Sequence, residues 1–252
     1  MAFAEPPAWY VISLRPQGGH AGLRRAAMTR GGGLIALSPW RLVFRDDAAT
    51  ADALRAALSA RRLIFTSPAA VQAAHALLPF AAGPGQDWIA VGSGTATALR
   101  KAGIEAVVAP ARMDSEGLLS LPALASVAGQ QVGLVTAPEG REFLLPALRQ
   151  RGAAVLRANV YARVPVALSA AALRRIRTLA MPAALAISSG GALQQLCTRA
   201  PADVLEHLRG LPVIAASARL QQLAHASGFA DVALADGPLP AQMIAAAAHR
   251  FR

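Results

Sequence analysis

The chain has 252 residues, which is long for one domain and comfortable for two small ones. Its net charge is +11, and Lys101 is its only lysine, so arginine supplies nearly all of the positive charge. No apolar run approaches the about 18 residues of a membrane span, and the N-terminal sequence lacks the basic and apolar regions of a signal peptide, which predicts a cytoplasmic protein.

The positive charge has two open interpretations. It suits an anionic partner, such as nucleic acid, lipid or a polyacidic small molecule, and it also fits a coding bias toward arginine and alanine. Aromatic residues make up only 5% of the chain, so the stacking side chains of RNA-recognition surfaces are scarce. We expect the cluster of Arg174, Arg175 and Arg177 to be the solvated face of a helix.

Short apolar runs alternate with amphipathic stretches along the whole chain. Strands that are apolar throughout and are each followed by a helix are typical of parallel sheets covered on both faces, so the pattern predicts an α/β fold. The expected strands, in chain order, are Tyr10–Leu14, Leu34–Leu37, Leu63–Phe65, Trp88–Val91, Ala106–Val108, Val132–Val135, Ala154–Leu156, Ala184–Ile187, Val213–Ala215 and Val232–Leu234.

The sequence contains an internal repeat. Ser67 corresponds to Ser189 at a spacing of about 122 residues, and Trp40 falls opposite Tyr161 at nearly the same spacing. Each repeat contributes about five of the expected strands. The repeat indicates an old duplication in which both halves keep the same strand-to-helix turn.

A polar extended stretch follows the second strand of each repeat, reading "PWRLVF" in the first and "VYARVP" in the second. Two such stretches at matching points predict two crossings between domains, so that one domain combines both chain ends. The expected boundaries are 1–38 with 166–252 for the first domain, 45–158 for the second, and 39–44 with 159–165 for the linker strands.

Serine residues stand at several of the expected strand-to-helix turns. Ser67, Ser189 and Ser217 are each suited to cap the helix that follows, and capping alone would explain any one of them. Taken together they permit a functional interpretation. The carboxyl ends of parallel strands face a common crevice, and the helix N-termini there present free N–H groups that suit anionic ligands.

Other patterns of chemical interest are incomplete. The "GSGT" turn after the strand ending near Val91 lacks the third glycine and the acidic residue of a dinucleotide fingerprint. The five histidines have no metal-ligand spacing, and no nucleophile motif is readable. We therefore expect neither a metal nor an organic cofactor, and we expect positioning and electrostatics to carry the chemistry.

Five segments together resemble the uroporphyrinogen-III synthase family, in the family's order and across nearly the whole chain: "IFTSPAAV", "IAVGSGTATALRKAGIEAVVAPARMDSEGLL", "GREFLLPALRQRGAAVLRANVYARVP", "ALAISSGGAL" and "SARLQQLAHASGF". Two features depart from the family pattern. Leu14 replaces the usual threonine before Arg15 and Pro16, and Pro146 falls inside an expected helix, which implies a late helix start or a kink.

The resemblance implies two flavodoxin-like domains with parallel sheets, a two-stranded linker and an active-site cleft between the domains. It implies a hydro-lyase of heme and siroheme biosynthesis that cyclises hydroxymethylbilane, with loss of water and inversion of ring D, to uroporphyrinogen III. The route would pass through an azafulvene cation and a spiro-pyrrolenine without a cofactor. The implied partners are the polyanionic substrate and, transiently, hydroxymethylbilane synthase, with no nucleic acid and no membrane.

The resemblance also implies site residues. Tyr161 is the catalytic candidate, because its protonated phenol can hydrogen-bond the departing hydroxyl; alternatively its ring packs between the domains, with Trp40 as its counterpart. We expect the arginines to anchor carboxylates, since guanidinium does not titrate usefully. The expected substrate-binding residues are Arg15, Thr66, Ser67, Gly92, Ser93, Arg141, Ser188, Ser189, Ser217 and Arg219.

Two other classes remain open at this point. A non-catalytic two-domain receptor for an anionic small molecule would have a similar architecture and would bind a tetrapyrrole without converting it. A basic nucleic-acid-associated protein would show salt-sensitive retention on DNA or RNA.

Overall fold

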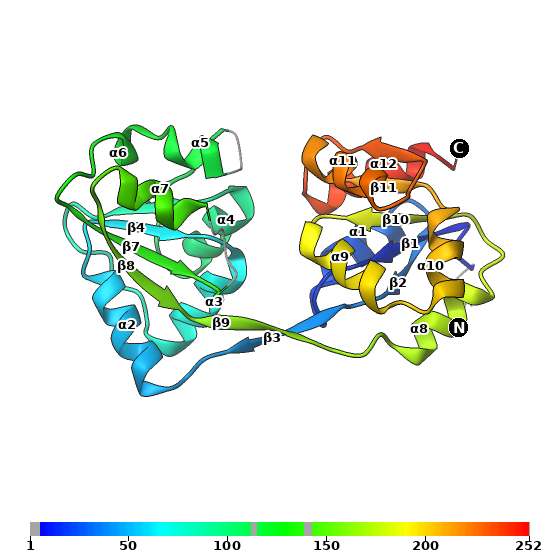
Figure 1. The fold of residues 1–252 in the computed structure, drawn as a ribbon, viewed down its shortest axis with the longest axis horizontal. Coiled ribbons are helices and arrows are strands. Elements are labelled where there is room, and N and C mark those ends of the chain that lie inside the picture. The colour runs from blue at the N-terminus through cyan, green and yellow to red at the C-terminus, as the bar shows by residue number, and fades with distance from the viewer. Residues whose placement is uncertain (1–5, 112–114, 139–142, 252) are drawn as a thin grey trace. The chain divides into compact units, whose positions relative to one another are not determined.

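Both ends of the chain contribute to one α/β unit, and the middle of the chain forms a second (Figure 1). The computed structural model describes residues 6–111, 115–138 and 143–251. Unit 1 comprises Met1–Arg41 with Val164–Arg252, and unit 2 comprises Leu42–Arg163. No helix in the described ranges is long and apolar enough to cross a membrane.

Unit 1 contains a five-stranded parallel sheet with the order β12-β11-β10-β1-β2. The chain runs from β1 to β2 on one side and from β10 through β12 on the other, so the strand order reverses between β1 and β10. The elements of unit 1 are β1 Trp9–Ser13, α1 Ala21–Met28, β2 Gly32–Ala36, α8 Ala170–Arg177, β10 Ala183–Ile187, α9 Gly190–Arg199, α10 Ala202–Arg209, β11 Val213–Ala215, α11 Ala218–Ala226, β12 Val232–Leu234 and α12 Pro240–His249.

Unit 2 contains a second five-stranded parallel sheet, with the order β6-β5-β4-β7-β8 and a reversal between β4 and β7. Its elements are α2 Ala48–Leu58, β4 Arg62–Phe65, α3 Pro68–Leu77, β5 Asp87–Ala90, α4 Ser93–Lys101, β6 Val107–Val108, α5 Ser115–Leu119, α6 Pro122–Ala125, β7 Gln131–Thr136, α7 Leu144–Gln150 and β8 Ala154–Asn159. The remaining strands, β3 Trp40–Phe44 and β9 Tyr161–Pro165, pair with each other in a two-stranded sheet.

The sheet of unit 2 is covered on both faces because its strands are apolar throughout. Leu63 and Phe65 of β4 pack on one face with residues of α2, α3 and α4. Ile64, between them, points to the other face, where α5, α6 and α7 contribute leucines. Gly133 of β7 permits close packing, since a methyl group there would lie 2.2 Å from the carbonyl oxygen of Ala57 in α2.

The structure confirms the predicted α/β class with two parallel sheets. Every strand expected from the apolar runs is present, with its ends shifted by a few residues. The duplication has a consequence for assembly. The first repeat supplies β1 and β2 to unit 1 but β4, β5 and β6 to unit 2. The second repeat supplies β7 and β8 to unit 2 but β10, β11 and β12 to unit 1.

Pro146 has a simple explanation in the structure. Helix α7 begins at Leu144, so Pro146 is its third residue. The first N–H groups of a helix have no intrahelical acceptor, and proline there costs no hydrogen bond. The late-start alternative is therefore confirmed.

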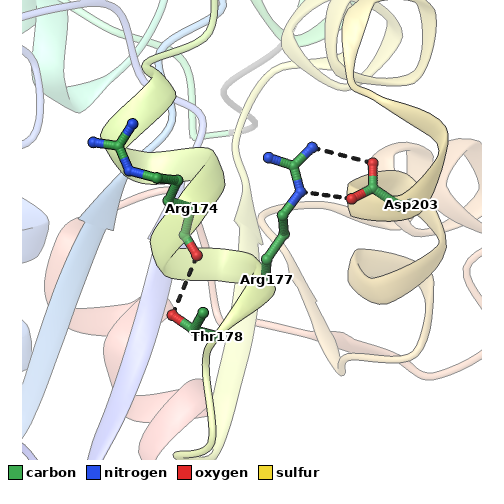
Figure 2. A network of polar contacts seen from close by, with 4 residues as sticks. All are labelled: Arg174, Arg177, Thr178 and Asp203. Atoms are coloured by element: carbon green, nitrogen blue, oxygen red, sulfur yellow. Dashed lines mark hydrogen bonds and ion pairs between the residues drawn. The ribbon is translucent and has the colours of Figure 1, made fainter.

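The arginines of α8 form a solvated face, as predicted. Arg177 donates from Nε and Nη2 to the two carboxylate oxygens of Asp203, at 2.6 and 3.2 Å, and so ties α8 to α10 (Figure 2). The Arg174 carbonyl accepts the Thr178 hydroxyl at 3.2 Å, while its guanidinium points away from Asp203 (Figure 2). Arg175 stacks on the ring of Tyr10, 4.5 Å from its centroid.

Candidate functional site

In open α/β sheets, ligands bind beyond the carboxyl ends of the strands where the strand order reverses. In unit 2 this point lies between β4 and β7, and Thr66 and Ser67 directly follow β4. The Thr66 hydroxyl donates to Oγ1 of Thr136, the last residue of β7, at 2.8 Å. Gly92 and Ser93 follow the adjacent β5 and begin α4. Four predicted site residues therefore lie at one edge of this sheet.

Ser67 caps α3 and also contacts Tyr161. Its Oγ accepts the N–H of Ala70 at 3.0 Å, with Pro68 at the first helical position, as the sequence predicted. The same Oγ lies 3.0 Å from the phenolic oxygen of Tyr161, and either hydroxyl can donate. The Tyr161 ring is 2% exposed and packs in the core of unit 2 with Phe65. The side chain of the catalytic candidate is therefore almost completely buried, and its hydroxyl contacts Ser67.

Arg163 is a neighbour of this phenol that sequence reasoning missed. Its Nη2 donates to the Tyr161 oxygen at 3.4 Å, and its guanidinium carbon lies 5.8 Å from the ring centroid. Both residues belong to β9, and residues two apart on a strand share a face. The spacing Tyr-x-Arg on an expected strand was the signal that could have identified it.

Arg157 holds the loop that follows β7. From β8, its Nη2 donates to the carbonyl oxygens of Ala137 and Pro138, and its Nε donates to Oδ1 of Asn159 at 2.9 Å. These bonds fix Ala137 and Pro138, the last described residues before the gap. The predicted anchor Arg141 itself, with Gly140, lies outside the described residues.

The remaining predicted residues gather at the equivalent edge of unit 1. Ser188 and Ser189 follow β10, Arg15 lies two residues after β1, and Ser217 lies two residues after β11. Ser189 and Ser217 cap α9 and α11 by accepting the N–H of Ala192 and Leu220, each at 3.4 Å. The order of the strands reverses between β10 and β1, which is where ligands preferentially bind in such a sheet. Arg15, Ser188 and Ser189 therefore lie at the preferred ligand position of unit 1.

Arg219 lies beside the N-terminus of α9. A methyl group on Gly190, the first residue of α9, would lie 3.5 Å from Nη1 of Arg219 and 2.9 Å from a methyl carbon of Leu223. Glycine therefore allows α9 and α11 to begin close together. The side chain of Arg219 is exposed, so its positive charge adds to that of the α9 N-terminus where solvent can reach both.

Arg15 is half-buried at the end of β1. Its Nη2 donates to the carbonyl oxygen of Pro238 at 3.4 Å, and burial lowers the pKa of this guanidinium. Its Nε is buried without a hydrogen-bond partner among the described atoms. A buried donor without an acceptor is costly, and the accessible part of the guanidinium remains a charged donor suited to a carboxylate.

Four helices that begin at these two edges have no acidic residue that would neutralise the positive end of the helix dipole. Within α3, α4, α9 and α11, all of whose residues are described, the first turn contains no Asp or Glu. The positive ends of these helix dipoles therefore remain available to an anion. In the described ranges no three His, Cys, Asp or Glu side chains lie together as a metal site would require.

Two open cavities are lined by other residues. A cavity of about 580 Å³ is lined by Ala8, Trp9, Thr29, Arg30, Ala248 and Phe251, and one of about 310 Å³ by Pro110, Ala111, Gly117, Ser120 and Leu121. None of these residues is a predicted site residue. We assign the candidate site from the strand ends and helix N-termini because the polar side chains converge there.

Comparison with known proteins identifies one family. Residues 22–245 match the sequence profile described as uroporphyrinogen-III synthase HemD. The chain is 34% identical over 155 residues to uroporphyrinogen-III synthase of Escherichia coli K12, covering 60% of this chain and 62% of the relative, which is less than two thirds of its length. It is 33% identical over 191 residues to uroporphyrinogen-III synthase of Salmonella typhimurium LT2, covering 72% and 76% of the two chains.

A solved structure gives the same fold. A mutant uroporphyrinogen III synthase from the extremely thermophilic bacterium Thermus thermophilus superimposes with a TM-score of 0.62 at 16% identity, covering 94% of this chain and 96% of that one. The comparisons give no support to the receptor or nucleic-acid alternatives.

Proposed function

We propose that this chain, which belongs to the uroporphyrinogen-III synthase family, acts as a hydro-lyase that cyclises hydroxymethylbilane to uroporphyrinogen III. The reaction breaks the carbon–oxygen bond of the terminal hydroxyl, releases that hydroxyl as water, and closes the macrocycle with ring D inverted. The observation that carries the proposal is the pair of strand-end edges, where serines cap α3, α9 and α11 and the first turns of α3, α4, α9 and α11 contain no acidic residue.

The substrate explains why such edges are useful. Its pyrrole side chains carry carboxylates, and helix N-termini and arginines are the groups that bind carboxylates well. We assign Arg15 and Arg219 to carboxylate anchoring in unit 1. In unit 2 the turns at Ser67 and Ser93 provide backbone N–H groups, and Arg141 is proposed from its sequence position alone.

In this proposal Tyr161 acts through its hydroxyl. Arg163 can only donate, so its bond occupies an acceptor site on the phenolic oxygen and leaves the phenolic proton to be donated. That proton is directed at Ser67 or, when Ser67 donates instead, at a ligand. A hydrogen bond from Tyr161 to the departing hydroxyl would favour its loss as water.

Transient contact with hydroxymethylbilane synthase also forms part of the proposal. Free hydroxymethylbilane closes spontaneously to the I isomer, so a short transfer between the two enzymes would limit that loss. Co-migration of the two proteins during turnover, compared with separate migration without substrate, would test this point.

The decisive experiment is isomer analysis of the product. Purified protein is given hydroxymethylbilane, and the uroporphyrin isomers are separated after oxidation. We expect isomer III in excess over a protein-free control, in which spontaneous closure gives isomer I. Isomer I alone, from protein that still binds the substrate, would contradict the enzyme and favour a receptor.

A further inference from the structure

His20 is a buried histidine that the proposed mechanism does not use. It directly precedes α1 and is 5% exposed. Its Nδ1 lies 2.9 Å from Oγ of Ser13, the last residue of β1, and its Nε2 lies 2.7 Å from Oγ of Ser38, two residues after β2. The ring therefore connects the ends of two adjacent strands with the start of a helix, all within unit 1.

Both ring nitrogens are satisfied when the ring is neutral. A neutral imidazole has one donor and one acceptor, so one serine accepts from it and the other donates to it. Burial, together with the charges of Arg24 and Arg15, lowers the pKa of His20 to about 4. The ring is therefore neutral near pH 7, and the two hydroxyl bonds can form together.

The loop between Ser13 and His20 carries Arg15, one of the proposed carboxylate anchors. This loop is also tied to the start of β3, because the Gln17 N–H donates to the carbonyl oxygen of Trp40 at 3.0 Å. Gly18 turns the loop with a φ of 78°, in the left-handed region that favours glycine. With the ring bridging Ser13 and Ser38, both ends of the loop are fixed to the segment after β2.

We propose that His20 is a positioning residue whose neutral ring, held between Ser13 and Ser38, keeps this loop in the conformation that presents Arg15 to a substrate carboxylate. The inference rests on the proposed function, because it assigns the carboxylate to the same substrate. It adds a residue that neither the family comparison nor the sequence pattern identified.

The order Ser38, His20, Ser13 also resembles a nucleophile, a base and a group that orients the base. A general base works best with a pKa near the operating pH, and a ring with a pKa of about 4 is a poor acceptor for a serine proton at pH 7. The structure therefore favours positioning over nucleophilic catalysis.

The test is a double-mutant cycle between His20 and Arg15. We expect His20→Ala and Arg15→Ala each to raise KM about tenfold, with kcat nearly unchanged, since each weakens one charge-assisted bond. If His20 acts through Arg15, the double variant should be little worse than Arg15→Ala alone. Binding of uroporphyrin III, measured by calorimetry, should follow the same pattern and needs no turnover.

Conservative variants separate positioning from general stability. His20→Asn keeps one of the two bonds and should restore part of the KM. If circular dichroism shows that His20→Ala does not fold, Ser38→Ala replaces it, because that change removes only one of the two bonds. Ser38→Ala should raise KM by less, and this increase should vanish in the Arg15→Ala background. Additive effects on KM, a fall in kcat alone, or labelling of Ser38 by diisopropyl fluorophosphate would overturn the inference.

The wild-type protein keeps this inference distinct from the proposed function. If the wild type forms isomer III but the His20 variants bind and react normally, only the positioning role fails. If the wild type forms isomer I alone, the proposed function itself is wrong, whatever the His20 variants do.

Discussion

The phenolic oxygen of Tyr161 lies 3.0 Å from Oγ of Ser67, a residue 94 positions earlier in the chain. Trp40, its counterpart in the other repeat, packs beside Gly191, where a methyl group would lie 3.6 Å from the indole ring. In each unit, the aromatic residue contributed by one repeat therefore packs against the serine turn contributed by the other. The two aromatic residues belong to different units, and each lies beside the start of a serine-capped helix, by a hydrogen bond in unit 2 and by ring packing in unit 1.

Tyr161→Phe should lower the rate of isomer III formation about tenfold to a hundredfold, because a hydrogen bond to a charged transition state contributes roughly 1.5–3 kcal/mol. The free energy of unfolding should fall by only ~1 kcal/mol, since Ser67 still caps α3. Initial rates and urea unfolding measure the two effects. The chain's other tyrosine gives a matched control, Tyr10→Phe, which should change neither. A normal rate in well-folded Tyr161→Phe would reduce Tyr161 to a packing residue.

Arg163→Ala should lower kcat about tenfold, because it removes the donor to the phenolic oxygen. Combined with Tyr161→Phe, it should add little, since the oxygen on which it acts is then absent. Arg163→Lys keeps the positive charge, so its kcat should fall by less than that of Arg163→Ala. The measurement is kcat for the two single variants and the double variant. Independent, multiplying losses would show that Arg163 acts on the substrate and not through Tyr161.

Arg219→Ala should weaken binding of uroporphyrin III about tenfold to a hundredfold, as expected for one charge-assisted bond. Ser67→Ala and Ser189→Ala should weaken binding by a smaller factor, because the backbone N–H groups remain. Arg141→Ala should resemble Arg219→Ala, and the double variant should be close to additive if the two hold different carboxylates. Calorimetry at increasing salt should show progressively weaker binding.

The control for this set is Arg174→Ala, which removes an equally positive, exposed side chain on α8 that is not at a strand end (Figure 2). The affinity of the Arg174→Ala variant for uroporphyrin III should equal that of the wild type. If Arg174→Ala weakens binding as much as Arg219→Ala, overall charge and not local anchoring governs affinity. If one substitution abolishes binding completely, anchoring is not distributed as proposed.

His20 predicts a specific acid sensitivity. Its pKa is lowered from 6.5 to about 4, so between these pH values the unfolded chain binds a proton that the folded protein does not. Stability from this group is therefore fully present above about pH 6.5 and is lost as the pH falls toward 4, by about 3 kcal/mol in total. Urea unfolding of the wild type and His20→Asn at pH 7 and pH 4.5 isolates the contribution. Equal acid losses in both proteins would contradict it.

Much of the fold follows from local features of the sequence. Apolar runs such as that of β4 predicted the strands because a strand buried on both faces needs nonpolar side chains at every position. Ser67, Ser189 and Ser217 predicted helix starts because capping depends only on the residues next to the turn. Both signals act within a few residues, where the chain itself fixes the geometry.

The sequence by itself thus determined the α/β class, the order of the elements, the duplication and the polar turns at the strand ends. Only the tertiary structure decided which side chains meet: Tyr161 with Ser67, His20 with Ser13 and Ser38, and Arg219 with the start of α9. These contacts join strands and helices brought together by sheet order and packing. Residue type limits what a side chain can bind, but the path of the whole backbone sets the distances between them, and no local pattern encodes that path.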